Sequence, residues 1–265
     1  MKIAICIPCY GDTKAKFTQS LASMIIHTGQ ANIVDQNDAT VRVEMEVFMV
    51  SCSMLTESRH RLVAEALAWG ADYMLCLDAD HTFPVDTLVR LLGHGLPVVG
   101  CNYARRFTPT APTAAVHASD DDDKGLLYTT LEKAEAGIVE ECAHLGFGVV
   151  LIDMRIFDAL QAHAEANGDG NFLPLFKFVE TENKIGMVGE DVFFFRKLAE
   201  AGVRPFVDHR LSWEVGHIFE VVLWNQTTLN HRDKWTVHMG ERGGKFAAKA
   251  AEIEQQAEGA LADGQ

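Results

Sequence analysis

Two carboxylates one residue apart, Asp78 and Asp80, follow the apolar run Tyr73–Leu77. A short continuous apolar run of this kind predicts a strand that is buried on both faces of a sheet. Because open α/β sheets bind ligands at the carboxyl ends of their strands, we expect both carboxylates at the mouth of a crevice. Oxygen ligands suit a hard divalent ion such as Mg²⁺ or Mn²⁺, especially one shared with a phosphate. The alternative is a polar loop in which Asp78 caps the next turn.

An aromatic and a cationic side chain stand at two other element ends. Tyr10 follows Pro8 at the end of the expected first strand, where its ring could stack on a nucleobase. Arg59 lies in the first turn of an expected helix, where a positive charge opposes the helix dipole. A phosphate or an acidic neighbour would explain this choice, since guanidinium matches such oxygens in a fork geometry. Otherwise Tyr10 is a half-buried loop residue and Arg59 faces solvent.

Glycines, carboxylates and a histidine follow in the second half of the chain. Gly146 and Gly148 precede an expected strand and would let the backbone approach a ligand closely, although an ordinary turn also explains them. Glu190 and Asp191 open an expected helix, where carboxylates are favourable as caps and in the field of the helix dipole. His217 offers a neutral imidazole to a metal ion, although a single histidine is more often an ordinary surface or core residue.

Composition sets broad limits on the class of protein. The chain has 265 residues, of which 48% are hydrophobic and 23% charged, as in ordinary globular proteins. A net charge of −14 argues against a general polyanion-binding surface. We see neither an apolar run long enough to span a bilayer nor an N-terminal signal core, so we expect a cytoplasmic protein.

Six cysteines are scattered through mostly apolar segments, which predicts reduced thiols and no disulfide framework. Cys6 and Cys9 have the spacing of a CxxC motif. No second pair completes a zinc site, and no βαβ unit precedes the motif, so a redox or zinc role is disfavoured.

Strands and helices are expected to alternate over residues 1–103. Strands are predicted at Lys2–Pro8, Val41–Ser51, Tyr73–Leu77 and Val98–Tyr103, with helices at Lys14–Thr28, around Leu62–Trp69 and from Pro84 to Gly93. This alternation predicts an α/β fold with a doubly wound, mostly parallel sheet.

The second half is less regular. Strands are predicted at Leu126–Leu131, Ile138–Cys142, Val149–Asp153, Arg204–Val207 and Leu211–Val215, and helices up to Ala166, from Gly189 to Ala201 and over Lys245–Ala262. The acidic run Asp120–Asp123 is expected to be a solvated loop.

The order of these motifs resembles that of the GT-A fold glycosyltransferases, particularly family-2-like enzymes, from residue 1 to about residue 220. Asp78-Ala79-Asp80 resembles their DxD motif, and Ser58-Arg59-His60 resembles the Ala-Arg-Asn segment near the donor in many members. Glu190-Asp191 is similar to the element that supplies the catalytic base in inverting members. His217 stands where several relatives have a third metal ligand.

The resemblance implies that a nucleotide-sugar donor binds across the carboxyl ends of the N-terminal strands. It implies a Mn²⁺ or Mg²⁺ ion held by Asp78, Asp80 and His217. It assigns catalysis to Asp191, as the base that deprotonates an acceptor hydroxyl, and to Glu190. The residues expected to bind the donor are Pro8, Tyr10, Ser51, Arg59, Asp78, Ala79, Asp80, Gly146, Phe147 and Gly148.

The resemblance also divides the chain. Residues 1–230 are expected to form a GT-A glycosyltransferase domain, with 1–103 as its nucleotide-binding half and 104–230 as its acceptor and catalytic half. Residues 231–265 are expected to form a polar C-terminal helical extension, through which copies of the chain could associate.

Several features leave the reaction open. Val50-Ser51-Cys52-Ser53 stands where many family-2 members read uracil with an acidic pair, so the donor could be a UDP-sugar or a GDP-sugar. The Gln-x-x-Arg-Trp signature of processive synthases is absent, which favours a single addition. Attack from the side opposite the leaving group would invert the anomeric configuration, but some GT-A relatives retain it.

Two other classes compete with a glycosyltransferase. A sugar-nucleotide nucleotidyltransferase would open with a Gly-rich basic loop, which Ile7–Asp12 is not. A non-catalytic nucleotide-sugar-binding protein would not need Asp78, Asp80, Asp191 and His217 together. The acceptor is open among a small sugar or glycan, a lipid head group, a protein and a modified nucleic-acid base. Arg105, Arg106 and the stretch His231–Arg242 could bind an anionic acceptor or be solvated charges.

Overall fold

The computed structural model describes residues 1–34, 39–116, 125–181, 186–219 and 221–262, with side chains left out at 221–223 and from 245 onward. The predicted acidic loop Asp120–Asp123 lies outside the described residues.

A seven-stranded sheet forms the centre of the molecule, with strand order β4-β1-β5-β9-β7-β12-β8. Its strands are β1 (Lys2–Cys9), β4 (Glu44–Ser51), β5 (Tyr73–Leu77), β7 (Val98–Gly100), β8 (Val139–Glu141), β9 (Val149–Asp153) and β12 (Phe206–Asp208). β1 runs parallel to β4 and β5, and β7 runs parallel to β12. β9 is antiparallel to both β5 and β7, and β8 is antiparallel to β12. All strands except β9 and β8 therefore share one direction, which confirms the predicted mostly parallel sheet.

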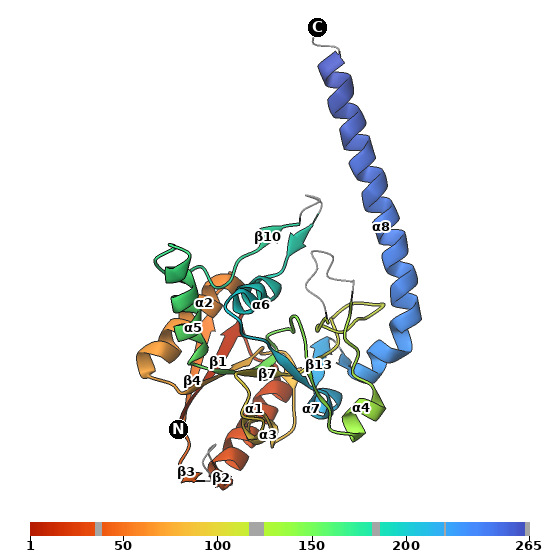
Figure 1. The fold of residues 1–265 in the computed structure, drawn as a ribbon. Coiled ribbons are helices and arrows are strands. Elements are labelled where there is room, and N and C mark those ends of the chain that lie inside the picture. The colour runs from red at the N-terminus through yellow and green to blue at the C-terminus, as the bar shows by residue number, and fades with distance from the viewer. Residues whose placement is uncertain (35–38, 117–124, 182–185, 220, 263–265) are drawn as a thin grey trace.

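Helices cover both faces of this sheet (Figure 1). On one face pack α2 (Leu55–Trp69), α5 (Ile156–Ala166) and α6 (Glu190–Glu200); on the other pack α1 (Ala15–Gln30), α3 (Thr87–Gly93) and α7 (His209–Glu214). Successive residues of β1 alternate between the two hydrophobic clusters, with Ala4 and Cys6 in the first and Ile3 and Ile5 in the second. This alternation follows from the two-residue period of a strand and explains why the buried strands read as continuous apolar runs.

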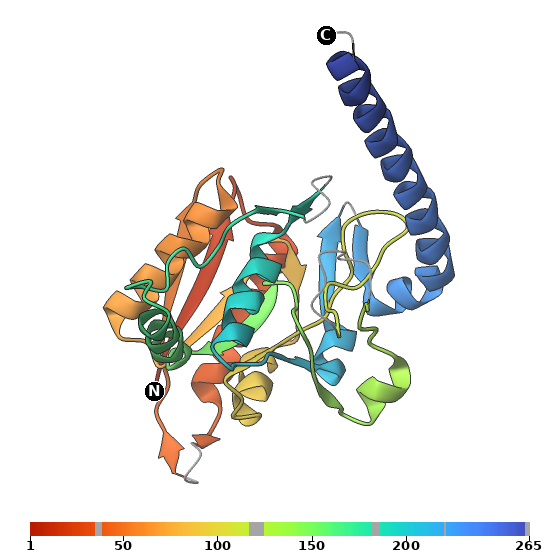
Figure 2. The same cartoon turned by 45° about the horizontal axis from the view of Figure 1, so that its top comes forward.

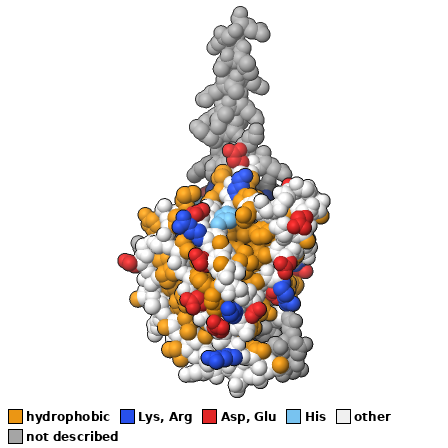
Figure 3. Space-filling model, turned by 90° about the vertical axis from the view of Figure 1, so that its left-hand side faces the viewer, with side chains coloured by type: hydrophobic (Ala, Val, Ile, Leu, Met, Phe, Trp, Pro, Cys, Tyr) orange, Lys and Arg blue, Asp and Glu red, His pale blue; other side chains and the backbone are white. Residues whose placement is uncertain are grey.

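Strand β4 lies at one edge of the sheet. In the described part of the chain no strand pairs with its outer side. Val47 and Met49 of β4 are exposed, as is Leu67 of the neighbouring helix α2. Figure 3 looks at this side of the molecule and shows hydrophobic side chains spread over it among charged ones.

A second, three-stranded sheet stands beside the first, with order β14-β13-β6. Its strands are β6 (His81–Thr82), β13 (Gly216–Phe219) and β14 (Val221–Trp224), all paired antiparallel. Two short hairpins, β2 (Ile33–Val34) with β3 (Thr40–Val41) and β10 (Val179–Glu180) with β11 (Met187–Val188), complete the strands. The second sheet joins the loop after β5 to a segment near the end of the chain.

The last helix, α8 (Asn225–Ala262), begins directly after β14. Its C-terminal half stands away from the body of the protein (Figures 1 and 2). The helix begins well before the predicted start at Lys245 and runs across the expected boundary at residue 231. Among the described helices, α8 included, we find none that combines the length and apolarity needed to cross a membrane.

Two predicted strands are wrong. Within Leu126–Leu131 the structure has a single isolated bridge, from Leu126 to Ala115, and helix α4 (Leu131–Glu135) begins there. The predicted strand Leu211–Val215 is largely helix α7. In both places a polar residue accepts a hydrogen bond from the helix start, Thr130 Oγ1 from Lys133 N and Asp208 Oδ1 from Leu211 N. These caps favour a helical turn over the extended form that the short apolar runs suggested.

Candidate metal centre

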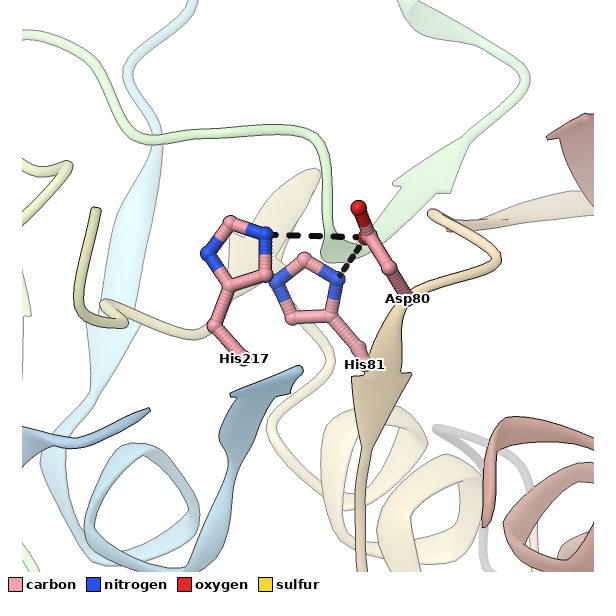
Figure 4. Close-up of side chains that lie close together, drawn as sticks. All are labelled: Asp80, His81 and His217. Atoms are coloured by element: carbon pink, nitrogen blue, oxygen red, sulfur yellow. Dashed lines mark ion pairs between the residues drawn. The ribbon is translucent and has the colours of Figure 1, made fainter. Parts of the chain in front are cut away.

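Asp80, His81 and His217 bring one carboxylate and two imidazoles together, with one ligand atom of each within 4.8 Å of the others (Figure 4). Asp80 lies in the loop between β5 and β6, and His81 is the first residue of β6. His217 in β13 is the antiparallel partner of His81. The main chain ties the loop to β13 as well, because Ile218 N–H donates to Asp80 O at 2.7 Å. Backbone pairing between the two strands therefore builds the cluster.

The side chains of this cluster lie close together. Asp80 Oδ1 is 3.1 Å from His81 Nδ1 and 3.6 Å from His217 Nε2. The two imidazole rings stack with their centroids 4.3 Å apart and an interplanar angle of 19°. Burial raises the pKa of the Asp80 carboxyl, but the two imidazoles lower it by more, so its pKa lies well below the usual range. Burial lowers the pKa of His81, which favours a neutral ring able to act as a ligand.

The polar atoms of the cluster fit a cation. Among the described residues, Asp80 Oδ1 and both ring nitrogens of His81 are buried without a hydrogen bond of acceptable geometry, even though Asp80 Oδ1 and His81 Nδ1 are close. His217 Nδ1–H donates to Ala104 O at 2.7 Å, which fixes the ring so that Nε2 faces Asp80. Buried polar groups normally have partners, and a metal ion would supply one to all three residues.

Arg106 also contacts this cluster. Its Nη1 lies 2.6 Å from Asp80 Oδ2, the oxygen that does not face the imidazoles. The Arg106 side chain is 50% exposed, whereas Asp80 is 21% exposed. Asp80 therefore has a cation on its open side in this structure.

Arg59 joins three elements next to the metal centre. Its Nη2 lies 3.2 Å from Asp78 Oδ1, at the end of β5, and its Nε lies 3.3 Å from Glu190 Oε1, at the start of α6. The guanidinium also lies over the ring of Phe147, 4.7 Å from the centroid. Although burial lowers the pKa of Arg59, its two carboxylate partners raise it by more, so the group stays charged. Arg59 is buried, so its guanidinium serves these carboxylates instead of facing solvent.

The two carboxylates at the start of α6 have raised pKa values. Burial is the main cause for Glu190, with a further contribution from Asp191 beside it. Burial also raises the pKa of Asp191, although the hydrogen bond from Val192 N to Asp191 Oδ1 opposes the shift. A raised pKa makes a carboxylate a stronger base near neutral pH.

Packing explains the two glycines before β9. A Cβ on Gly148 would lie 2.5 Å from the His81 ring and 2.7 Å from the Tyr103 ring. A Cβ on Gly146 would overlap the hydroxyl of Tyr103. Gly148 N–H donates to Tyr103 Oη at 2.8 Å. These glycines therefore allow the strand β9 to approach the metal centre and its supporting tyrosine.

The predicted site residues fall into separate groups. Asp80 and His217 meet in the metal centre, whereas the predicted ligand Asp78 faces Arg59 and is not one of the three clustered residues. His81 is the member of the cluster that the sequence analysis did not single out, although it directly follows Asp80.

The remaining residues that were predicted to bind the donor lie at or near the carboxyl ends of β1, β4 and β5. Tyr10 is 82% exposed just beyond β1, and Ser51 ends β4 opposite Cys9. Pro8 is buried within β1, and Ala79 packs partly against the core. The Phe147 side chain is buried among the phenylalanines of the core, so only its backbone could border a ligand.

No family model and no curated protein matches the chain. Among solved structures, the A197 protein from STIV is 15% identical, with a TM-score of 0.49 over 83% of this chain and 86% of that one. GalNAc-T7, solved with UDP, GalNAc and Mn²⁺, is 12% identical, with a TM-score of 0.48 over 83% of this chain. This chain spans 44% of the length of the GalNAc-T7 chain. Both similarities are distant, and the site is assigned from its side chains alone.

Proposed function

We propose that the protein is a metal-dependent GT-A glycosyltransferase that moves a sugar from a nucleotide-sugar donor to an acceptor hydroxyl. The observation that carries the proposal is the buried cluster of Asp80, His81 and His217 beyond the carboxyl end of β5. The carboxylates of Asp78 and Glu190 reach the same region through Arg59. A metal ion beside Glu190 and Asp191, whose pKa values burial raises, would suit sugar transfer from a diphosphate leaving group.

Mn²⁺ is the ion that we propose. Imidazole ligands suit transition-metal ions, whereas Mg²⁺ favours oxygen ligands. Two imidazoles and one carboxylate therefore favour Mn²⁺ over Mg²⁺. The ion would supply Lewis-acid stabilisation of the negative charge on the departing nucleotide diphosphate. Asp80, His81 and His217 would hold it, and Asp78 would keep Arg59 in place beside it.

The other roles belong to residues of the chain. Asp191 would accept the proton of the acceptor hydroxyl, and burial supports this role by raising its pKa. Glu190 would hold Arg59. Tyr10 would stack on the nucleobase, since its ring is free of the core at the end of β1. Attack with Asp191 on the far side of the sugar from the leaving group would invert the anomeric configuration.

Thermal stability in the presence of nucleotide sugars tests the proposal. We expect one UDP- or GDP-sugar to raise Tm with Mn²⁺ and to have no effect without it, because binding to the folded state stabilises it. Asp80→Ala should abolish both the Tm shift and sugar transfer, whereas the exposed Asp158→Ala on α5 should leave both unchanged. Transfer that persists in Asp80→Ala would refute the metal-dependent mechanism. Formation of a nucleotide sugar and pyrophosphate from a nucleoside triphosphate and a sugar 1-phosphate would instead indicate a nucleotidyltransferase.

A further inference from the structure

The loop that carries Arg106 is fixed at its base. Ala104 and Pro112 form an isolated bridge, Arg105 N–H donates to Ala111 O at 2.8 Å, and Thr110 Oγ1 donates to Arg105 O at 2.6 Å. The tip of the loop rests on α8, where the rings of Phe107 and Trp235 lie 5.0 Å apart. The backbone of Arg106 is therefore held beside the metal centre, whereas its side chain is half exposed and not enclosed by the fold.

Arg106 occupies the open side of Asp80. Oδ1 of Asp80 faces the two imidazoles, and Oδ2 faces the guanidinium. A carboxylate with this partner has its charge balanced without a metal ion. A divalent ion between Asp80 and the two imidazoles would lie within a few ångströms of the Arg106 charge, and the two cations would repel each other.

A diphosphate offers Arg106 another partner. Guanidinium binds phosphate oxygens in the same fork geometry in which it binds a carboxylate. A donor diphosphate that shares the ion with Asp80 would bring such oxygens to the side on which Arg106 now lies. The phosphate charge would then relieve the repulsion between Arg106 and the metal ion.

We propose that Arg106 is an internal counter-cation, which holds Asp80 until a divalent ion binds and then transfers to the diphosphate of the donor. The proposal rests on the proposed function, because it needs both a metal ion and a diphosphate at this site. Arg106 would then weaken binding of the ion alone and strengthen binding of the ion together with a nucleotide. Metal and donor would therefore bind cooperatively.

Calorimetric titration of Arg106→Ala with Mn²⁺ and with a nucleoside diphosphate tests this exchange. Without nucleotide, the variant should bind Mn²⁺ roughly fivefold more tightly than the wild type, because an ion pair of this exposure is lost. At saturating Mn²⁺, it should bind UDP or GDP roughly tenfold more weakly, because a charge-assisted contact is lost. Arg106→Lys, which keeps the charge without the fork, should lie between the wild type and Arg106→Ala in both titrations.

The opposite signs of the two effects separate exchange from loop support. If Arg106 only supported the loop, its removal would weaken Mn²⁺ and nucleotide together, and this result would overturn the proposal. Unchanged Mn²⁺ affinity would also overturn it. The matched control is Arg155→Ala, which removes another exposed arginine that pairs with an aspartate, Asp153, far from the metal centre. It should change neither titration.

The same titrations distinguish this proposal from the proposed function. If the wild type binds no Mn²⁺, or binds it equally well in Asp80→Ala, the metal centre itself is wrong. If the wild type binds Mn²⁺ through Asp80 but Arg106→Ala does not bind it more tightly, the metal centre stands and the exchange is wrong. Circular dichroism and the Tm of each variant verify that substitution of the half-exposed Arg106 leaves the fold intact.

Discussion

His81 and His217 are held at a fixed distance by the strands that carry them. Directly opposed residues of an antiparallel pair have Cβ atoms about 4.5–5.5 Å apart, so their side chains meet without further support. The stacked rings and the bond from His217 Nδ1 to Ala104 O then set the direction of each nitrogen. Side chains prepared in this way would lose little conformational entropy on binding an ion.

Gly148→Ala should disturb this arrangement. The added Cβ would lie 2.5 Å from the His81 ring, so the ring or β9 must move. We expect a loss of roughly 1–3 kcal/mol in the free energy of unfolding, as for overpacked cores. We also expect weaker Mn²⁺ binding, because His81 leaves its position between Asp80 and Tyr103. Urea denaturation and Mn²⁺ titration measure the two effects.

Gly29→Ala is the control for this substitution. Gly29 lies in α1, its Cβ would meet nothing within 4 Å, and alanine favours a helix by about 0.5–1 kcal/mol over glycine. This variant should be as stable as the wild type or more so, with unchanged Mn²⁺ affinity. If both variants behaved alike, the close packing of Gly148 against His81 would not matter.

The residues of the metal centre could be predicted only in part. Asp80 stood out because it follows a buried strand, and His217 because of its place in an ordered set of motifs. His81 did not, because a histidine beside an aspartate has no distinctive spacing, and its role depends on a partner strand far along the chain. The sequence indicated a phosphate or an acidic neighbour for Arg59, but not that this neighbour would be Asp78, since that pairing requires α2 and β5 to be in contact.

At the scale of elements, Arg59 connects α2, the end of β5 and the start of α6. Arg59→Leu should cost about 3–5 kcal/mol in the free energy of unfolding, because it leaves the carboxylates of Asp78 and Glu190 without their cation. The exposed Arg61→Leu removes only a surface pair with Glu57 and should have a small effect. Equal losses in the two variants would contradict the role of Arg59 as a connector.

Asp208 should make stability depend on pH. Burial raises its pKa, but the hydrogen bonds from His94 and from Leu211 N lower it by more, so the folded-state pKa lies below the unfolded value of about 3.9. Such a group stabilises the fold above the unfolded pKa and loses this contribution as the pH falls through the folded pKa.

Asp208→Asn keeps a good helix cap and removes only the charge. We expect it to be less stable than the wild type by about 1–2 kcal/mol at pH 7, since a hydrogen bond to a charged group is lost. The difference should shrink as the pH falls below about 4. Urea denaturation across this range measures it, and a constant difference would contradict the assigned cause.

The element pattern was predictable where periodicity was long and clear. β1, β5 and β9 agree closely with their predicted ranges, as do α1 and α6. The short apolar runs at Leu126–Leu131 and Leu211–Val215 led to wrong strand predictions, because a run of five or six residues is too short to distinguish a strand from a helical turn. The antiparallel direction of β9 was not predictable either, since an apolar run carries no sign of strand direction.

At the scale of the whole molecule, the long helix α8 has two unequal parts. Near its start, Asn225 and Thr228 are fully buried, and Asn225 Nδ2 donates to Asn102 O at 2.7 Å. Trp235 is 3% exposed against the Arg106 loop. A cavity of about 490 Å³ lies between this loop and α8, lined by Thr108, Pro109, His231, Asp233, Lys234, Val237, His238 and Glu241. Beyond this region α8 stands away from the body (Figure 2).

Truncation should separate these parts. A chain that ends at Gly243 keeps Trp235 and should unfold with an unchanged Tm. Trp235→Ala should instead cost about 3–5 kcal/mol, as expected for a large buried aromatic side chain. It should also release Phe107 and loosen the loop that holds Arg106, so we expect weaker nucleotide binding in the presence of Mn²⁺. Thermal denaturation of the full and the truncated chain at two protein concentrations completes the test. If the projecting part of α8 contacts a second copy of the chain, truncation should lower Tm, and by more at the higher concentration.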